Sequence, residues 1–582
     1  MNTSPTRLRR VRAGNPVRFL LPARADLTEM GRSPRRDLLA GLTVAIVALP
    51  LALGFGVSSG LGAEAGLATA VIAGAFAAVF GGSNLQVSGP TGAMTVVLVP
   101  IVVRYGPTGV LTVGLIAGFL LVALAVLKAG RYMQYVPAPV VEGFTLGIAC
   151  VIGLQQIPNA LGVAKPDGDK VLVVTWRAIQ EFVHTPNWTA VALALGVAVL
   201  MLVGARLRPT IPFSIVSVIA ATITAQLFRL DAAKPIGDLP SGLPAPSLGF
   251  LDLSAVGSLL APAVAVAALA ALESLLSAQV ADGMTVGQKH NPDKELLGQG
   301  LANIAAPLFG GVPATGAIAR TAVNVRTGAS SRLAALTHAV VLAMIVFAAA
   351  PLVSKIPLAA LAGVLIATAI RMVEAGSLCA MAKATRSDAL ILVLTAAATI
   401  ALDLVHAVII GLAVAGALAL RAVAKQARLD RVDFIPDLPG EHSAEEHALL
   451  AEHIVAYRLD GPLFFVGARR FLLELSEVAD VHVVILRMSR ITTLDATGAL
   501  VLKDAVQKLN RRGIVVMTSG IRPGQRQVLD SVGALDLLRL EGREYATTPE
   551  AIVGARTYLE DAGVLTAPPA HSARASVQEH AR

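Results

Sequence analysis

The chain has 582 residues, of which 55% are hydrophobic and 15% are charged, with a formal net charge of +9 and a mean hydropathy of +0.69. This composition is too apolar for an ordinary soluble protein and indicates a membrane protein. The two cysteines, Cys150 and Cys379, lie in or beside apolar segments without metal-ligand spacing, so the sequence predicts no disulfide framework, no metal site and no cofactor.

The N-terminal 37 residues carry nine arginines against three acidic residues and lack the apolar core and cleavage site of a signal peptide. We interpret residues 1–36 as a basic cytoplasmic arm held against the anionic inner leaflet. Binding of nucleic acid is disfavoured because membrane segments begin immediately afterwards.

Apolar runs of about 20 residues, the length that a helix needs to cross a bilayer, recur from Leu38 to Leu420. We predict a transmembrane domain over residues 37–425 with fourteen spans, of which the third and the tenth look short. Basic residues of the loops fall on the side of the N-terminal arm, which predicts a multi-pass protein of the cytoplasmic membrane with both termini cytoplasmic. The two longest loops, about 157–188 and 229–255, are then outside. The predicted spans begin near residues 38, 64, 89, 108, 137, 189, 211, 256, 293, 315, 331, 356, 388 and 405.

The membrane part contains an internal repeat. VFGGSNLQVSGPTGAM (79–94) and LFGGVPATGAIART (308–321) both run from Phe-Gly-Gly through a short extended piece to a helix start rich in small residues. With seven spans in each half, the two halves enter the membrane from opposite sides. This inverted repeat predicts discontinuous helices near the bilayer midplane.

The two broken helices have the properties of an anion site. Pro90 would occupy the first helical position after Ser88 and Gly89, and Thr315 would cap the second helix. Each start gathers free N–H groups and about half a positive charge, so two facing starts form a positive concavity. The same small residues could merely allow close helix packing, but the paired motifs favour the site. The residues that leave room for a ligand are Gly89, Gly92, Ala93, Gly316 and Ala317.

Three polar residues stand out in the apolar segments. Glu273, in ALAALESLLS, is the only charged residue between Asp252 and Asp282. Arg320 lies about one turn into the second broken helix, where it needs Glu273 or the anion as a partner unless it reaches the membrane interface. His338 could relay protons, but we interpret it as a packing histidine with satisfied hydrogen bonds.

The remainder of the chain is more polar. We predict a linker at 426–442, a small α/β domain at 443–565 built from alternating strands and helices, and a disordered tail at 566–582. The domain shows no phosphate-binding glycine loop, zinc-ligand spacing or nucleophile elbow. It is therefore predicted to be a regulatory or assembly module, and the chain is not predicted to be an enzyme.

Several long motifs occur in an order that resembles the sulfate permease (SulP) family of anion transporters: LQVSGPTGAM, ALESLLSAQVADGMT, ELLGQGLANIAAPLFGGVPATGAIARTAVN and LDATG. The resemblance spans about residues 35–560. It implies an α-helical membrane protein with fourteen spans in a seven-plus-seven inverted repeat, a core domain that slides against a gate domain, a cytoplasmic STAS domain and a homodimer.

The resemblance also implies site residues. It implies an anion between the third and tenth helix starts, closed over by the first helix. In the STAS domain it implies Asp495 and Thr497 at the acid and phosphoacceptor positions, although an ordinary capped helix start is the plainer interpretation; phosphate there would be electrostatically favourable. The STAS domain could also bind a cytoplasmic protein. The implied anion-binding residues are Pro50, Leu51, Phe55, Ser88, Gly89, Pro90, Thr91, Gly92, Ala93, Thr315, Gly316, Ala317, Ile318, Ala319 and Arg320.

Glu273 and Ser277 hold the positions that bind sodium in bicarbonate transporters of the family, whereas in proton-coupled relatives the same acid titrates. At an effective dielectric constant near 20, a carboxylate about 6 Å from a bound anion repels it by about 3 kcal/mol. A proton or a sodium ion would remove most of this repulsion. We favour a proton, because burial favours the neutral carboxyl group and the residues around Glu273 are mostly Ala and Leu. Ala278, where the bicarbonate carriers have a second hydroxyl, also departs from the sodium-coupled pattern.

These features predict a secondary active transporter of small anions such as sulfate, bicarbonate or a dicarboxylate like fumarate, coupled to protons. The alternatives are a sodium-coupled bicarbonate or anion symporter and an uncoupled exchanger or channel. A membrane-anchored signalling protein is disfavoured because signalling needs no positive cavity at the midplane.

Overall fold

The computed structural model describes residues 28–425, except 167, 169, 209–210, 231–233, 238, 240–241, 253, 287 and 403, and then residues 428–432, 452–464 and 481–565. The chain divides into two compact units, Met1–Ala415 and Gly416–Arg582. Most of the predicted basic arm, most of the predicted linker and the predicted tail lie outside the described residues. The described part of the linker, residues 428–432, forms strand β3.

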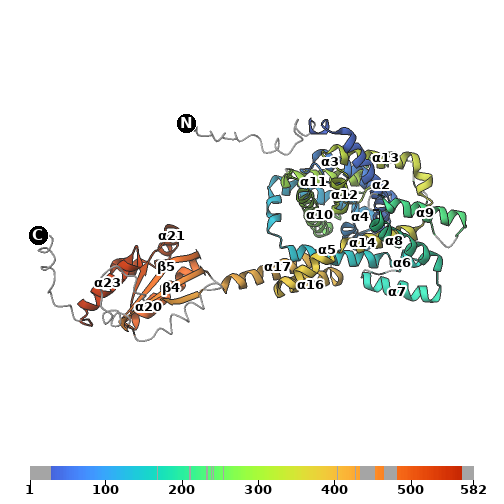
Figure 1. The fold of residues 1–582 in the computed structure, drawn as a ribbon. Coiled ribbons are helices and arrows are strands. Elements are labelled where there is room, and N and C mark those ends of the chain that lie inside the picture. The colour runs from blue at the N-terminus through green and yellow to red at the C-terminus, as the bar shows by residue number, and fades with distance from the viewer. Residues whose placement is uncertain are drawn as a thin grey trace, which may run out of the picture. The chain divides into compact units, whose positions relative to one another are not determined.

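The first unit is a bundle of apolar helices (Figure 1). Each predicted span start lies within four residues of an observed helix start, or, for the fourth span, of a break inside α4. Nine helices of the described chain are long and apolar enough to cross a membrane. The number of crossings remains a prediction. The helices that correspond to the predicted spans are α2 (Pro34–Ser59), α3 (Ala63–Phe80), α4 (Gly92–Val126), α5 (Ala138–Gln155), α8 (Trp188–Leu207), α9 (Phe213–Leu227), α10 (Val256–Met284), α11 (Pro292–Leu308), α12 (Ile318–Arg326), α13 (Leu333–Val353), α14 (Leu358–Met372), α16 (Arg386–Ala401) and α17 (Leu404–Ala424).

Helix packing displays the inverted repeat. In the first half of the repeat, α2 and α3 pack against α13 of the second half; α10 and α11 of the second half pack against α4 of the first. In the same way, α5 packs against α16 and α14 packs against α8. Exchanging the halves converts one set of contacts into the other. The predicted architecture is therefore confirmed, with one group of helices around α4 and α13 and another around α5 and α14.

The third and fourth predicted spans are one helix with a break. Within α4, Gly106 has φ 70° and ψ −177°, values outside the helical region, and Pro107 follows it. Glycine is the residue that reaches this backbone conformation without a steric penalty, and proline cannot continue the hydrogen-bond ladder across the break. The break therefore divides α4 into two helical pieces, which correspond to the third and fourth predicted spans.

The connections between the predicted spans also contain helices. The predicted outer loop 157–188 holds α6 (Ile157–Leu161) and α7 (Val171–His184). The connection before α5 holds the short 3₁₀ helix η1 (Ala129–Tyr135), and the connection between α14 and α16 holds α15 (Ala375–Ala384).

The second unit is a five-stranded sheet with helices on both faces. Its strand order is β3-β4-β5-β6-β7, with β3 antiparallel to β4 and the other pairs parallel. Successive β5 residues alternate between faces: Val484 packs in the cluster of α20, whereas Val483 packs in that of α23. The prediction of a small α/β domain is confirmed. The elements are β3 (Arg428–Val432), β4 (Ile454–Leu463), β5 (Val483–Leu494), α20 (Ala496–Arg511), β6 (Val515–Ser519), α21 (Pro523–Ser531), α22 (Asp536–Leu540), β7 (Glu544–Tyr545) and α23 (Thr548–Asp561).

Candidate anion site

Two short strands bring the broken helices together. Strand β1 (Ser88–Gly89) pairs antiparallel with β2 (Thr315–Gly316). The amide of Ala317 extends the pairing by donating to the carbonyl of Val87 over 2.8 Å. Helix α4 begins just after β1 and α12 just after β2, so the helix starts meet as the repeat predicts.

The caps of these helices differ from the prediction. The N-cap of α4 is Thr91, whose hydroxyl accepts from the amide of Met94, so Pro90 precedes the cap and is not the first helical residue. The N-cap of α12 is Ala317, without a side-chain hydrogen bond, so Thr315 does not cap it. The reason is that strand pairing takes up residues 315–316, which delays the helix, and the Thr315 hydroxyl has another partner.

That partner is Glu273, a half-buried carboxylate on α10. One carboxylate oxygen, Oε2, accepts from Thr91 Oγ1 at 2.9 Å and from Thr315 Oγ1 at 2.7 Å. The two hydroxyl oxygens are 3.1 Å apart. A single carboxylate thus joins the starts of both broken helices. Ser277, one turn further along α10, instead donates to Thr321 Oγ1 over 2.9 Å.

Arg320 is only 1% exposed and lies in the first turn of α12. One guanidinium nitrogen, Nη2, donates to the carbonyl of Pro90, whereas Nη1 has no hydrogen-bond partner in the described part of the chain. Its charge interacts with that of Glu273, although the two side chains have different hydrogen-bond partners. Arg320 therefore supplies buried positive charge beside β1 and is not exposed at the surface of the helical unit.

The first helix covers the start of α4. A Cβ atom built on Gly92 would lie 3.1 Å from Phe55 Cε1 of α2 and 2.1 Å from Ile152 Cδ1 of α5. Phe55 was expected here from the sequence, but Ile152 carries no sequence signal beyond its place in an apolar span. The other predicted residues Pro50, Leu51 and Ala93 are buried, Ile318 is half-buried and Ala319 is exposed.

Three polar side chains on α11 form hydrogen bonds with the segments that lead into the paired strands β1 and β2. Glu295 accepts through Oε2 from the amides of Gly82 (2.7 Å) and Ser83 (3.0 Å), and through Oε1 from Gln86 and Gln299. Gln299 also donates to the hydroxyl of Ser88 in β1. Asn303 exchanges two hydrogen bonds with the backbone of Ala314, just before β2. Sequence reasoning missed these residues, although three polar side chains at four-residue spacing in an apolar segment are a readable signal.

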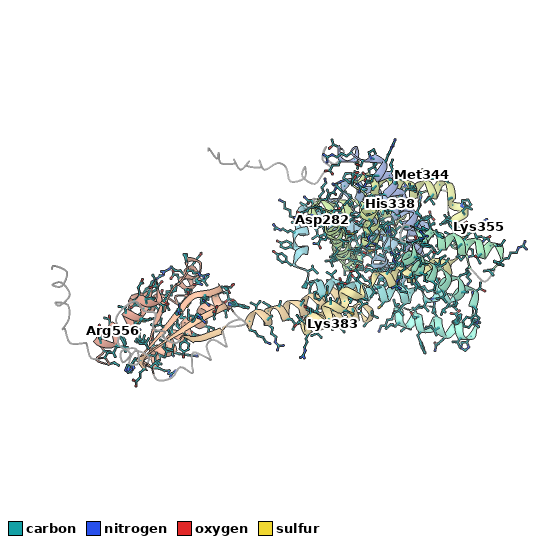
Figure 2. All side chains as sticks on the ribbon, viewed as in Figure 1. Asp282, His338, Met344, Lys355, Lys383 and Arg556 are labelled. Atoms are coloured by element: carbon teal, nitrogen blue, oxygen red, sulfur yellow. The ribbon has the colours of Figure 1, made fainter. Side chains whose placement is uncertain are left out.

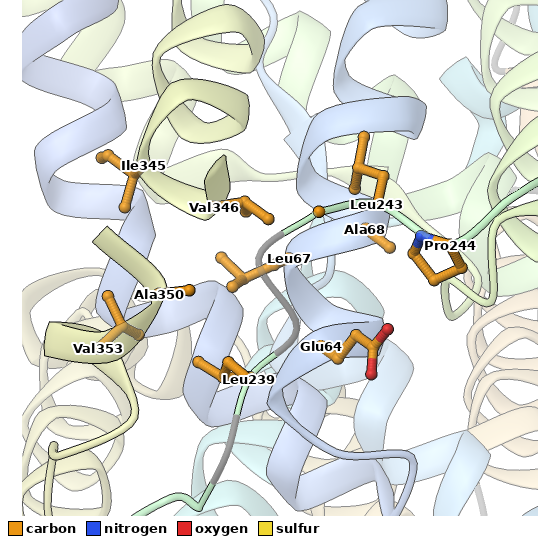
Figure 3. A pocket seen from close by; sticks show the side chains of 11 residues that line it. Glu64, Leu67, Ala68, Leu239, Leu243, Pro244, Ile345, Val346, Ala350 and Val353 are labelled. Atoms are coloured by element: carbon orange, nitrogen blue, oxygen red, sulfur yellow. The ribbon is translucent and has the colours of Figure 1, made fainter. Parts of the chain in front are cut away.

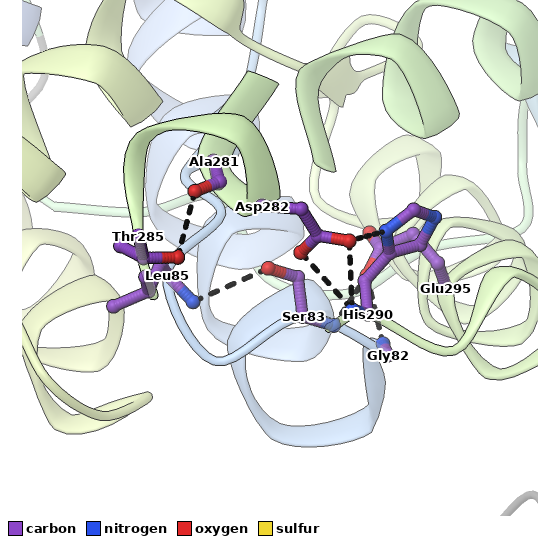
Figure 4. A network of polar contacts seen from close by, with 8 residues as sticks. All are labelled: Gly82, Ser83, Leu85, Ala281, Asp282, Thr285, His290 and Glu295. Carbon is purple, nitrogen blue, oxygen red and sulfur yellow. Dashed lines mark hydrogen bonds and ion pairs between the residues drawn. The ribbon is translucent and has the colours of Figure 1, made fainter. Parts of the chain in front are cut away.

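A histidine–carboxylate contact lies next to Glu295, where the chain passes from α10 to α11. His290 Nδ1 lies 2.7 Å from Asp282 Oδ2, and the backbone amide of His290 also donates to that carboxylate. Figure 4 shows this pair beside Ser83 and Glu295. The contact ties the end of α10 to the segment before α11.

His338 is fully buried on α13, inside the helical unit (Figure 2). Neither of its ring nitrogens has a hydrogen-bond partner among the residues that the structure describes. The expectation of a packing histidine with satisfied hydrogen bonds is therefore wrong on the second point.

The described pocket lies away from the crossing strands. It has a volume of about 340 Å³, including space open to solvent, and is lined mainly by apolar side chains of α3 and α13 and by Leu239, Gly242, Leu243 and Pro244, with Glu64 at its edge (Figure 3). Its apolar lining offers an anion no counter-charge.

In the second unit, Asp495 is the N-cap of α20 and accepts from the amide of Gly498 over 2.7 Å. Thr497 is exposed in the first turn of that helix. This is the geometry of a capped helix start with an accessible hydroxyl.

Comparison with known proteins matches two family models: the Sulfate permease family over residues 35–395 and the STAS domain over residues 448–551. A putative sulfate transporter of Bacillus subtilis, YvdB, is 35% identical over 86% of this chain and 94% of its own length. The bicarbonate transporter BicA of Synechocystis is 33% identical over 84% of this chain and 88% of its own.

Solved structures of transporters are also similar to this chain. The transmembrane domain of a cyanobacterial BicA matches with a TM-score of 0.61 and 34% identity, covering 65% of this chain and 98% of that one. The murine anion transporter Slc26a9 in its inward-facing state matches with a TM-score of 0.82 over 94% of this chain and 97% of its own; at 15% identity it shows the fold alone. The family resemblance and the expectation of a transporter rather than an enzyme are confirmed.

Proposed function

The chain belongs to the sulfate permease family of anion transporters, and we propose that it is a secondary active transporter that carries a small anion across the cytoplasmic membrane together with a proton. The observation that carries this proposal is the contact of the Glu273 carboxylate with Thr91 and Thr315, one hydroxyl from each broken helix. Any change in the charge of Glu273 then acts on both helix starts at once.

The proposed anion position lies between the two helix starts. Backbone N–H groups at the N-termini of α4 and α12 favour negative charge there. Arg320 adds a full positive charge, and its Nη1 has no hydrogen-bond partner in the described chain. The side chains of Phe55 and Leu51 on α2 are proposed to close over the anion.

The proposed proton coupling rests on the two hydroxyl groups that donate hydrogen bonds to Glu273. While the carboxylate is ionised, it holds both threonine hydroxyls as donors and repels an arriving anion by about 3 kcal/mol at about 6 Å. A protonated carboxyl group carries no charge and donates its own O–H, so the hydroxyls of Thr91 and Thr315 can turn to the anion. Anion binding and proton binding then favour each other.

Sodium is a second candidate for the coupling ion, and a specific observation favours it. Glu273 Oε2, Thr91 Oγ1 and Thr315 Oγ1 form a triangle of oxygens with sides of 2.9, 2.7 and 3.1 Å. Hard cations bind oxygen ligands. Glu273 therefore has oxygen ligands from two threonines beside it, in addition to the Ala and Leu residues of its own helix. Against sodium, the Ser277 hydroxyl is engaged by Thr321.

The proposed substrates are inorganic oxyanions. Relatives covering most of this chain are named as sulfate and bicarbonate transporters, and a compact site made mainly of backbone donors suits such anions; fumarate is the third candidate.

We further propose a homodimer, a cytoplasmic protein partner of the STAS domain and regulation by phosphorylation of Thr497.

The test is uptake of labelled sulfate, bicarbonate and fumarate into proteoliposomes under an inward proton gradient, an inward sodium gradient or neither. Wild type and Glu273→Gln are compared. The amide is neutral at every pH, so we expect the variant to lose the dependence on the proton gradient. Glu142→Gln is the matched control, because Glu142 accepts a hydrogen bond from Ser377 over 3.0 Å, which an amide oxygen can also accept.

Uptake that follows sodium and not protons would replace the proton by sodium as the coupling ion. Uptake indifferent to both gradients and to Glu273→Gln would contradict coupled transport and indicate an uncoupled exchanger or channel.

A further inference from the structure

Helix α7 (Val171–His184) has two apolar faces. One face packs inward: Val174, Thr175 and Ala178 are buried against α5 and α6, and the Thr175 hydroxyl donates to the carbonyl of Leu154 in α5 over 3.1 Å. Figure 1 shows α7 beside α6. The helix is therefore fixed to the group of helices around α5.

The second apolar face is exposed. It consists of Leu172, Trp176, Ile179 and Val183, which are 52%, 62%, 39% and 71% exposed. Their spacing of i, i+4, i+7 and i+11 places them in one stripe along the helix. The polar side of the helix, between this stripe and the buried face, carries Arg177, Gln180, Glu181 and His184, together with the exposed Val173 (40%). Such a division into an apolar stripe and a polar side is the pattern of a helix that lies along a membrane surface.

The two tryptophans of the chain both belong to this region. Trp176 lies on the stripe, and Trp188, which is 68% exposed, begins α8 four residues after α7 ends. Trp188 stacks edge-on against Phe182 of α7, with ring centroids 5.3 Å apart. Tryptophan concentrates at membrane–water interfaces because its ring has an apolar body and a polar N–H group.

The neighbouring helix also exposes apolar side chains. Helix α8 is an apolar helix of span length, and it exposes Leu195 (61%), Val199 (48%) and Val203 (49%) at four-residue spacing. These exposed apolar residues of a predicted span, together with the tryptophans, favour lipid as the occupant of the stripe.

We propose that α7 is an interfacial anchor: its stripe Leu172–Trp176–Ile179–Val183 is buried in the headgroup–acyl boundary of one leaflet, and it holds the outer end of α5 at the membrane surface. Because α5 places Ile152 against the start of α4, the anchor would fix one wall of the candidate anion site relative to the bilayer.

The test uses Trp188→Phe, which leaves Trp176 as the only tryptophan of the full chain. The variant is reconstituted in phosphatidylcholine vesicles with bromines near the headgroup end of the acyl chains, near the methyl end, or absent. We expect Trp176 emission to be lost most with bromines near the headgroup end and to be protected from aqueous iodide.

Two results would overturn the proposal. Quenching by iodide without quenching by brominated lipid would place the stripe in water; protection from both would place it against a second copy of the chain. As a second arm, Val183→Asp in the same background should reduce lipid quenching and shift the emission to the red, whereas the neighbouring His184→Asp on the polar side, two turns from Trp176, should change neither.

Discussion

At the residue scale, glycine at the crossing strands makes room for a buried charge. A Cβ atom built on Gly89 would lie 2.6 Å from Nη1 of Arg320 and 3.6 Å from the Cα atom of Ala70. Since Arg320 is buried, its guanidinium group has little space into which it can withdraw. Gly89 therefore sets the position of the positive charge beside the proposed anion.

We predict that Gly89→Ala displaces Arg320 and abolishes most anion uptake, at a cost of about 1–3 kcal/mol in the free energy of unfolding, as for other overpacked sites. Uptake into proteoliposomes and the thermal unfolding midpoint measure the two effects. Gly153→Ala on α5 is the control, because nothing lies within 4 Å of a Cβ atom built there. Wild-type uptake by Gly89→Ala would show that the Arg320 position is not critical.

Glu295 is a second residue whose role follows from its hydrogen bonds. Four donors converge on its two oxygens, and Gln86 and Gln299 among them are almost fully buried. In Glu295→Gln, one oxygen becomes an NH₂ group and two of these donors lose their acceptor. Each loss costs about 1–3 kcal/mol.

We therefore expect Glu295→Gln to lower the thermal unfolding midpoint of the purified protein clearly, while Glu142→Gln leaves it nearly unchanged. The prediction fails if both variants unfold at the wild-type temperature, since Glu295 would then not hold the loop 82–83.

At the element scale, the sequence predicts helix positions better than helix ends. Every predicted span start lies within four residues of an observed helix start or, for the fourth span, of the break in α4. The agreement is close because a run of about 20 apolar residues is favourable only as a helix within the bilayer. The caps at Pro90 and Thr315 were misplaced because the β1–β2 pairing joins residues more than 220 positions apart, which no local pattern reveals. The three polar side chains of α11 were readable, whereas Ile152 was not, because only tertiary packing distinguishes it from its apolar neighbours.

The break in α4 gives an element-scale prediction. Gly106 has φ 70° and ψ −177°, a region nearly exclusive to glycine, and nothing lies within 4 Å of a Cβ atom built there. Gly106→Ala should therefore cost about 1–3 kcal/mol from backbone strain alone. Gly257→Ala on α10 is the control: a Cβ atom there also meets open space, but Gly257 lacks the positive φ, so the variant adds a methyl group without backbone strain. Equal thermal stabilities of the two variants would argue against the break.

At the scale of the whole molecule, the inverted repeat and the basic loops together predict an orientation. The predicted odd number of crossings in each half makes the halves point in opposite directions, and the exchanged helix contacts are those expected of two repeats. From the positive loops we predict that both termini, and the connection that contains α15, are cytoplasmic. Helix α7 is then predicted on the opposite side, where the proposed interfacial anchor would meet the outer leaflet.

The two native cysteines allow this orientation to be measured. Cys379 on α15 is exposed, and Cys150 is partly buried within α5. We expect a membrane-impermeant maleimide to label the protein in inverted vesicles and not in intact spheroplasts, and Cys379→Ser to remove the label. In the Cys379→Ser background, Gln180→Cys on the polar side of α7 should restore labelling from the outside only. Labelling of Cys379 in intact spheroplasts would reverse the orientation, and with it the side from which the coupling proton reaches Glu273.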